Sequence, residues 1–87
     1  MILQITRIDK VPSKYGGTCY MVLFQDVKTY KSYRTWIYPK MGNFKNWEHI
    51  IRKGKGTKLT GLRILRRDII DADSVPFIIE EKLFRGW

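Results

Sequence analysis

Hydrophobic and polar positions alternate along three stretches in the first half of the chain, as is typical of β-strands. Residues 2–11, ILQITRIDKV, alternate imperfectly, which indicates a strand that bends or is partly buried on both faces. Residues 18–26, TCYMVLFQD, and residues 31–38, KSYRTWIY, are rich in β-branched and aromatic side chains. A loop with a proline and paired glycines separates the first two strands, and a short connection joins the second to the third.

The length of that short connection determines which side chains of the second and third strands share a face. If Asp26 faces Lys31 across a four-residue loop, the facing pairs are Phe24 with Tyr33, Val22 with Thr35 and Tyr20 with Ile37. This set makes the better core face. The opposite face then holds Cys19, Met21 and Leu23 beside Arg34, Trp36 and Tyr38. A loop of three or five residues would exchange the two faces, because a slip of one residue turns every side chain over.

One helix is expected, over NFKNWEHIIRK. Phe44, Trp47 and Ile51 recur at helical spacing on one face, with Ile50 near them, so this face is expected to join the core. Asn43 or Asn46 is the expected N-cap, since an asparagine oxygen can accept from an unpaired amide. A glycine, Gly54 or Gly56, is expected to end the helix.

Two further strands are expected after the helix. Residues 57–67, TKLTGLRILRR, predict a fourth strand with a bulge at Gly61, where the parity of the apolar positions changes. Residues 68–74 predict an acidic loop, and residues 75–81, VPFIIEE, predict a fifth strand with Pro76 near its start. The expected fold is therefore all-β, a small five-stranded barrel with one helix in the order β-β-β-α-β-β.

Length and composition are those of one small globular domain. The 87 residues, 44 % of them hydrophobic, allow a domain over residues 1–81 and a short tail, 82–87. No run approaches 18 apolar residues, and the N-terminus lacks the features of a signal peptide, so no contact with a membrane is expected. The single cysteine, Cys19, cannot form an internal disulfide, which favours the reducing environment of the cytoplasm.

Charge is distributed unevenly along the chain. The net charge is +9. Residues 28–67 hold twelve Lys or Arg and a single acid, Glu48, a local charge of +11, whereas residues 68–81 hold five acids and no base. A basic protein of this kind favours a polyanionic partner, either nucleic acid or an anionic surface.

The strand order and one motif point to the same class of partner. Five strands with a helix between the third and fourth is the order of the OB-fold. The run from RTW through YPKMGNFKNWEHIIRKGKGTKLTGLRI resembles the third strand, helix and fourth strand of bacterial single-stranded DNA-binding proteins. The resemblance implies a role in DNA replication, repair or recombination. It also implies that Trp36, in a T-x-W-like third strand, stacks on bases.

The candidate site residues follow from these observations. Trp36 is the expected stacking platform, with Arg34 and Tyr38 in the same row and Met21 beside them, since stacking on an aromatic face needs no particular base. The alternative is that Trp36 packs under the helix or against Met21. Tyr15 and Tyr30 are expected to add aromatic contacts from the two loops, or else to be ordinary loop residues. The expected phosphate contacts are Lys14, Lys28, Lys31, Lys40, Lys58 and Arg66. Arg63, Arg66 and Arg67 either continue a basic track or neutralise Asp68 and Asp71.

Other chemistry has little support. The run KGKGTK lacks the spacing of a phosphate-binding loop and follows a helix, so nucleotide hydrolysis is rejected. His49 has no second ligand at suitable spacing, the acids of 68–73 lack a calcium-loop pattern, and Cys19 is expected to be inert. No nucleophile, base and orienting acid can be assembled. We therefore expect no enzyme, no metal and no cofactor.

The sequence predicts non-catalytic binding of single-stranded DNA with little sequence preference. Two other hypotheses remain open: an RNA- or ribosome-binding OB module, and an adaptor, for example one encoded by a phage, whose aromatic strand face binds a partner protein. A homo-oligomer is also considered, because a small sheet has an exposed edge and the tail carries Leu83, Phe84 and Trp87.

Overall fold

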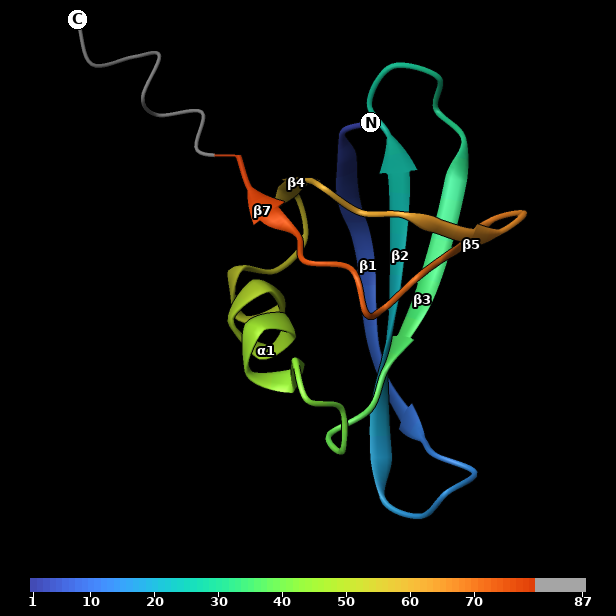
Figure 1. The fold of residues 1–87 in the computed structure, drawn as a ribbon, viewed down its shortest axis with the longest axis vertical. Helices are drawn as coiled ribbons and strands as arrows, with labels where there is room; N and C mark the ends of the chain where they lie inside the picture. Colours follow the sequence, from blue (N-terminus) through green and yellow to red (C-terminus); the bar gives the residue numbers. More distant parts are fainter. Residues whose placement is uncertain (80–87) are drawn as a thin grey trace, which may run out of the picture.

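Three antiparallel strands form the centre of the structure: β1 (Leu3–Pro12), β2 (Thr18–Asp26) and β3 (Ser32–Ile37) (Figure 1). The structure is a computed structural model and describes residues 1–79. The last two residues of the fifth predicted strand, 80 and 81, and the predicted tail, 82–87, lie outside the described residues. Within residues 1–79, no helix has the length and apolar character needed to cross a membrane.

The predicted register of β2 and β3 is confirmed. Phe24 faces Tyr33, Val22 faces Thr35 and Tyr20 faces Ile37. The four-residue loop is closed by two backbone hydrogen bonds, from Asp26 N–H to the Lys31 carbonyl (2.8 Å) and from Tyr30 N–H to the Asp26 carbonyl (2.9 Å). The face predicted to be core is therefore the buried one, and the face with Trp36 is turned away from it.

The bend expected in the first strand is a bulge. The pairing of β1 with β2 shifts between Ile5 and Arg7, and the hydroxyl of the intervening Thr6 donates to the Leu23 carbonyl (3.3 Å). The bulge lets Ile5 remain in the core while Arg7 lies opposite Leu23 on the other face. The imperfect alternation of the sequence is thus explained by one inserted residue.

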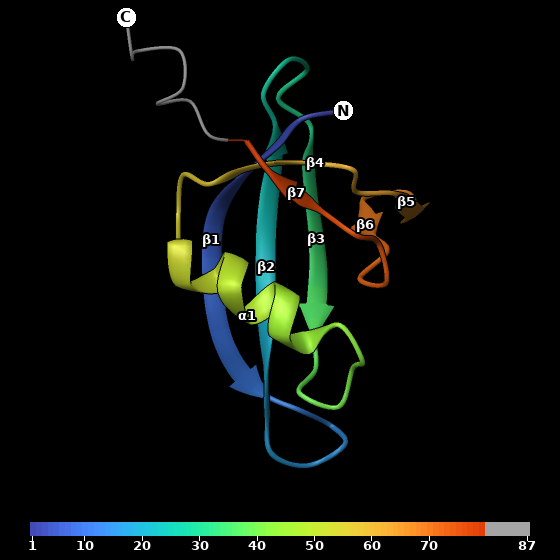
Figure 2. The same ribbon diagram turned by 60° about the vertical axis from the view of Figure 1, so that its left-hand side comes forward.

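The helix, α1 (Phe44–Lys53), lies across the inner face of this sheet (Figure 2). Trp47 and Ile50 are buried, and the Trp47 and Phe24 rings are 6.3 Å apart. Asn43 occupies the N-cap position, but the predicted capping bond is absent: its side-chain nitrogen donates to the Ala72 carbonyl (2.7 Å), and its side-chain oxygen is buried without a hydrogen-bond partner. Gly54 ends the helix with a positive φ of 81°, as the sequence indicates.

The core combines the inner sheet face with this helix. Its buried members are Leu3, Ile5, Val22, Phe24, Tyr33, Ile37, Trp47, Ile50, Leu59, Leu62 and Ile70. Phe44 and Ile51 are partly buried against them. The predicted apolar face of the helix is therefore confirmed.

The prediction of five strands is wrong, because seven strands are present in residues 1–79. The predicted fourth strand consists of β4 (Lys58–Thr60) and β5 (Ile64–Arg66), separated at Gly61, which has a φ of 86°. The predicted acidic loop contains a short strand, β6 (Ile69–Ile70), and the described part of the predicted fifth strand is regular only over β7 (Phe77–Ile78).

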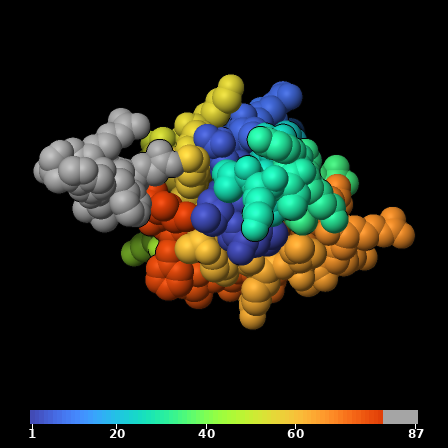
Figure 3. Space-filling model, turned by 90° about the horizontal axis from the view of Figure 1, so that it is seen from above, coloured from blue at the N-terminus to red at the C-terminus, as the bar shows by residue number. Residues whose placement is uncertain are grey.

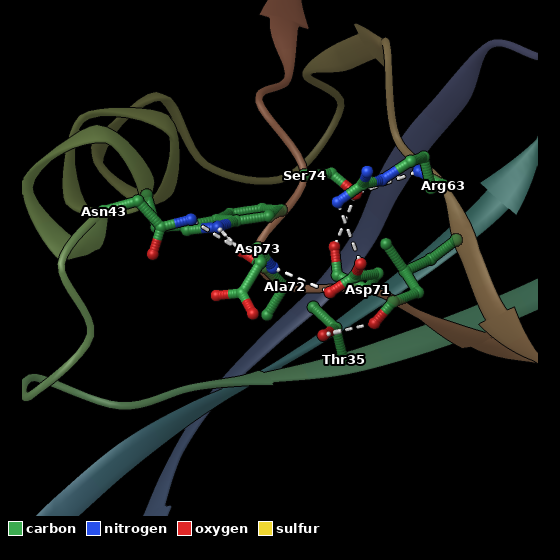
Figure 4. A network of polar contacts seen from close by, with 9 residues as sticks. Thr35, Asn43, Arg63, Asp71, Ala72, Asp73 and Ser74 are labelled. Carbon is green, nitrogen blue, oxygen red and sulfur yellow. Dashed lines mark hydrogen bonds and ion pairs between the residues drawn. The ribbon is translucent and has the colours of Figure 1, made fainter.

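These four short strands are the two ends of a single interrupted hairpin. At one end β4 pairs with β7, and at the other end β5 pairs with β6, both antiparallel. A polar network fills the interruption (Figure 4). In it, Arg63 binds the Asp71 carboxylate (3.0 Å), and Ser74 donates to the Asp71 carbonyl (2.6 Å) and accepts from Arg63 N–H (3.0 Å). The network connects to the helix through Ala72, whose carbonyl accepts from the Trp47 indole (2.8 Å).

This hairpin makes the sheet curl into a half-barrel. The strand order is β5-β6-β3-β2-β1-β4-β7, so one end of the hairpin pairs with β1 and the other end with β3. The pairing of β3 with β6 is parallel and places Arg34 opposite Ile69. Two hydrogen bonds of 2.9 Å fasten this junction, from Arg34 N–H to the Asp68 carbonyl and from the Thr35 hydroxyl to the Ile70 carbonyl.

We predict that Gly61→Ala destabilises the fold by about 1–3 kcal/mol, as expected for an alanine held at positive φ. A Cβ at this position would also lie 2.9 Å from the Val75 carbonyl oxygen. Gly42→Ala is the matched control, because its Cβ would meet nothing within 4 Å, and its effect should stay within about 0.5 kcal/mol. Urea unfolding measures both. Equal stability of the two variants would contradict the proposed strain.

We also predict that Asp26 makes the hairpin sensitive to acid. Its carboxylate accepts hydrogen bonds from the backbone N–H of Lys28 (2.8 Å) and of Thr29 (3.1 Å), and these bonds lower the pKa of Asp26 below its ordinary value of 3.8. The resulting stabilisation is present above pH 3.8 and is lost as the pH falls through the lowered pKa.

Asp26→Asn retains an acceptor but cannot titrate, so the wild type should lose stability relative to this variant as the pH falls below 3.8. Thermal unfolding measured between pH 2 and pH 7 tests this. A difference between the two proteins that stays constant over that range would show that Asp26 does not contribute.

Candidate nucleic-acid interface

A row of three side chains follows the outer face of β3 and the residue after it. Arg34 is exposed, and Trp36 and Tyr38 are half-buried. None belongs to the core, and Trp36 lies directly opposite Met21 on β2, on the face away from the helix. Trp36 therefore does not pack under the helix, but it does lie beside Met21, the other position considered for it. We call Arg34, Trp36 and Tyr38 the β3 track.

Arg34 and Trp36 form one composite surface. The Arg34 guanidinium lies over the Trp36 ring, with its Cζ 5.5 Å from the ring centroid. Cation–π contact of this kind leaves the guanidinium N–H groups free to bind an anion while the indole presents an apolar face. The pair thus places an aromatic face on which a base could stack beside hydrogen-bond donors that could bind a phosphate.

The Tyr38 end of the track is bordered by the loop between β1 and β2. Tyr15 from this loop contacts Tyr38 edge to face, with ring centroids 5.7 Å apart, and the Lys14 ammonium lies 5.2 Å from the Tyr15 ring centroid. The two tyrosines and Lys40 line a hollow of about 500 Å³. Gly16 and Gly17, with φ of 93° and 70°, give the loop its sharp turn.

The Arg34 end is bordered by the β5–β6 hairpin. A hollow of about 550 Å³ is lined there by Arg34, Arg66, Arg67, Asp68 and Ile69. Seen from above, the orange segment that carries β5 projects from the body of the molecule (Figure 3). The hydrogen bonds to Arg34 and Thr35 described above hold this hairpin against β3.

A third hollow, of about 340 Å³, lies between these two. Trp36, Tyr38, Leu65 and Ile69 are among its lining residues. It shares Tyr38 with the first hollow and Ile69 with the second. The three hollows therefore follow β3 one after another, with aromatic rings at one end and guanidinium groups at the other.

The remaining predicted site residues lie outside these three hollows. Lys28, Tyr30 and Lys31 are at the loop between β2 and β3, where Tyr30 is 72 % exposed and has a φ of 64°. Lys58 lies on β4, which β1 and β2 separate from β3. The structure thus brings Arg34, Trp36, Tyr38, Met21, Tyr15, Lys14, Lys40 and Arg66 to one surface and leaves Lys58 apart.

Arg63, Arg66 and Arg67 were expected either to neutralise nearby acids or to continue a basic track, and the structure divides them between these two roles. Arg63 neutralises Asp71 at 3.0 Å. Arg66 and Arg67, by contrast, line the hollow beside Arg34. Leu65 and Ile69 were not among the predicted site residues. The signal was the apolar pair Ile69–Ile70 inside an acidic stretch, which is too short to show a period of two.

Residues 1–79 contain no group of three or more His, Cys, Asp or Glu side chains placed to hold a metal. His49 is exposed on the helix, and Cys19 is buried. Comparison with protein-family models, with curated proteins and with solved structures gives no match to this chain.

Proposed function

We propose that this protein binds single-stranded nucleic acid without catalysis and with little sequence preference, DNA in preference to RNA. The observation that carries the proposal is the β3 track, where Trp36 and Tyr38 remain accessible outside the core between two basic borders. Aromatic faces are reached only by bases that are not paired, and stacking is tolerant of base identity. The preference for DNA rests on the resemblance of the third strand and helix to bacterial single-stranded DNA-binding proteins.

The strand pairing supports an OB-like arrangement. The β4/β5 segment and the β6/β7 segment correspond to the fourth and fifth strands of that fold, each interrupted once. The start of the first pairs with β1, and the start of the second runs parallel to β3. OB-folds bind oligonucleotides on the face of their second and third strands, between the first loop and the loop before the last strand. In this chain that face carries Met21 and the β3 track.

The proposed mode of binding combines stacking with charge. Bases stack on Trp36 and Tyr38, and Tyr15 covers the end of the row. Lys14, Lys40, Arg34 and Arg66 contact phosphates at the two borders. The basic residues supply attraction that depends on salt, whereas the rings supply contacts that depend much less on salt.

We expect Trp36→Ala to weaken binding of poly(dT) by about 1–3 kcal/mol, the contribution of one stacked base, and to abolish most of the fluorescence quenching on binding. Phe77→Ala is the matched control, because this ring is 64 % exposed on β7 and lies outside the hollows along β3. Fluorescence titration measures both, with circular dichroism to verify folding. An unchanged titration by folded Trp36→Ala would refute the stacking role, and the same oligomers as RNA would test the preference for DNA.

We also expect the logarithm of the binding constant to fall linearly with the logarithm of the salt concentration, with a slope of about −0.7 per phosphate contacted. Lys14→Ala or Lys40→Ala should each make the slope less steep by about that amount. Lys45→Ala on the exposed side of the helix should leave it unchanged. Equal slopes for all three variants would show that these lysines do not contact the strand.

A further inference from the structure

The six arginines of residues 1–79 fall into two groups according to their partners. Three form ion pairs: Arg7 with Asp9 (2.7 Å), Arg52 with Glu48 (3.6 Å) and Arg63 with Asp71 (3.0 Å). The other three, Arg34, Arg66 and Arg67, have no carboxylate at ion-pair distance among the described residues. All three of these line the same hollow of about 550 Å³. We call it the arginine hollow.

The charge of the arginine hollow is unbalanced. Its three guanidinium groups and the single carboxylate of Asp68 give the lining a formal charge of +2. Like charges gathered around one space repel each other, so the arrangement favours an anion between them. Guanidinium groups bind phosphate oxygens with paired, parallel hydrogen bonds, which makes phosphate the anion that best suits this lining.

The backbone holds this cluster in a conformation that is uncommon for residues with side chains. Arg67 has a φ of 45° at the turn between β5 and β6. The turn is fastened to β3 by the bond from Arg34 N–H to the Asp68 carbonyl. A two-residue turn between the paired Arg66 and Ile69 ordinarily contains a positive φ, so this conformation belongs to the turn that places Arg66 and Arg67 beside Arg34.

We infer that the arginine hollow binds the terminal phosphate of a single strand whose last base stacks on Trp36. A phosphodiester within a strand carries one negative charge, whereas a terminal phosphomonoester carries about −1.5 to −2 at pH 7. The doubly charged group matches the +2 of the lining. Trp36 is adjacent because the Arg34 guanidinium lies over its ring.

This inference rests on the proposed function and adds a preference for strand ends. Binding through the rings and lysines alone would not distinguish an oligonucleotide with a terminal phosphate from one without. With the arginine hollow, a phosphorylated end gains hydrogen bonds to charged groups that a hydroxyl end cannot make to the same extent.

The experiment compares dT oligomers that carry a 5′-phosphate, a 3′-phosphate or no terminal phosphate, titrated by fluorescence anisotropy at constant salt. Wild type should bind one phosphorylated form at least about tenfold more tightly than the unphosphorylated form, as expected from hydrogen bonds to charged groups. The preference should shrink from pH 7.5 to pH 5, because the monoester loses its second charge near pH 6.

Two variants and one control connect the preference to the hollow. Arg66→Ala should reduce the preference for the phosphorylated end, and Arg67→Gly should do so without straining the turn, since glycine accepts a positive φ. Arg52→Ala on the helix, where the guanidinium pairs with Glu48, should keep the full preference.

The outcomes distinguish this inference from the proposed function. If wild type binds all three oligomers equally, the inference is wrong and the proposed function stands. If wild type binds none of them, both are wrong. A preference that the Arg66 and Arg67 variants retain in full would also overturn the inference, because the terminal phosphate would then be bound elsewhere.

Discussion

The register between β2 and β3 determines which side chains of these strands enter the core and which remain on the outer face. In a strand the faces alternate at each residue, so the same pairing that turns Phe24 and Tyr33 inward also turns Met21 and Trp36 outward. The four-residue loop and the bonds that Asp26 makes within it set this pairing. Tyr30 adopts a left-handed conformation to close the loop, which few residues with a side chain do. The core and the β3 track are thus two results of one turn.

The interrupted hairpin brings Arg66 and Arg67 next to Arg34 on β3. Its two arms pair as strands at both ends but not in the middle, where Arg63 on one arm is bonded to Asp71 and Ser74 on the other, through side chains and one backbone hydrogen bond. The acidic stretch therefore has a structural role near its centre. Asp71 neutralises Arg63, and the Ala72 carbonyl holds the helix through Trp47 and Asn43. Arg66 and Arg67 lie beside Arg34, and among the described residues neither has a carboxylate at ion-pair distance.

The regular parts of the fold could be predicted because they depend on local patterns. Alternation indicates the faces of β2 and β3, and the helical spacing of Phe44, Trp47 and Ile51 indicates a packed face. The position of β6 depends instead on a parallel pairing between Arg34 and Ile69, which are far apart in the sequence. A strand of two residues, Ile69–Ile70, is too short to show a periodicity, and no local pattern reveals that it pairs with β3. The sequence placed Arg34 and Arg66 among the candidate site residues, but it did not reveal that they line one hollow together with Arg67.

The loop between β1 and β2 would determine how long a strand bound in the proposed way stays in place. It extends beyond the helix (Figure 2). Three hydrogen bonds join its own residues Ser13, Tyr15, Gly16 and Gly17, and the Tyr15–Tyr38 ring contact connects it to the end of β3. Segments with so few buried contacts open at a much smaller free-energy cost than the whole domain. A strand covered by Tyr15 would leave when this loop opens, while the core stays folded. Its dissociation rate would then be governed by the loop, and substitutions there would change residence time without changing the stability of the fold.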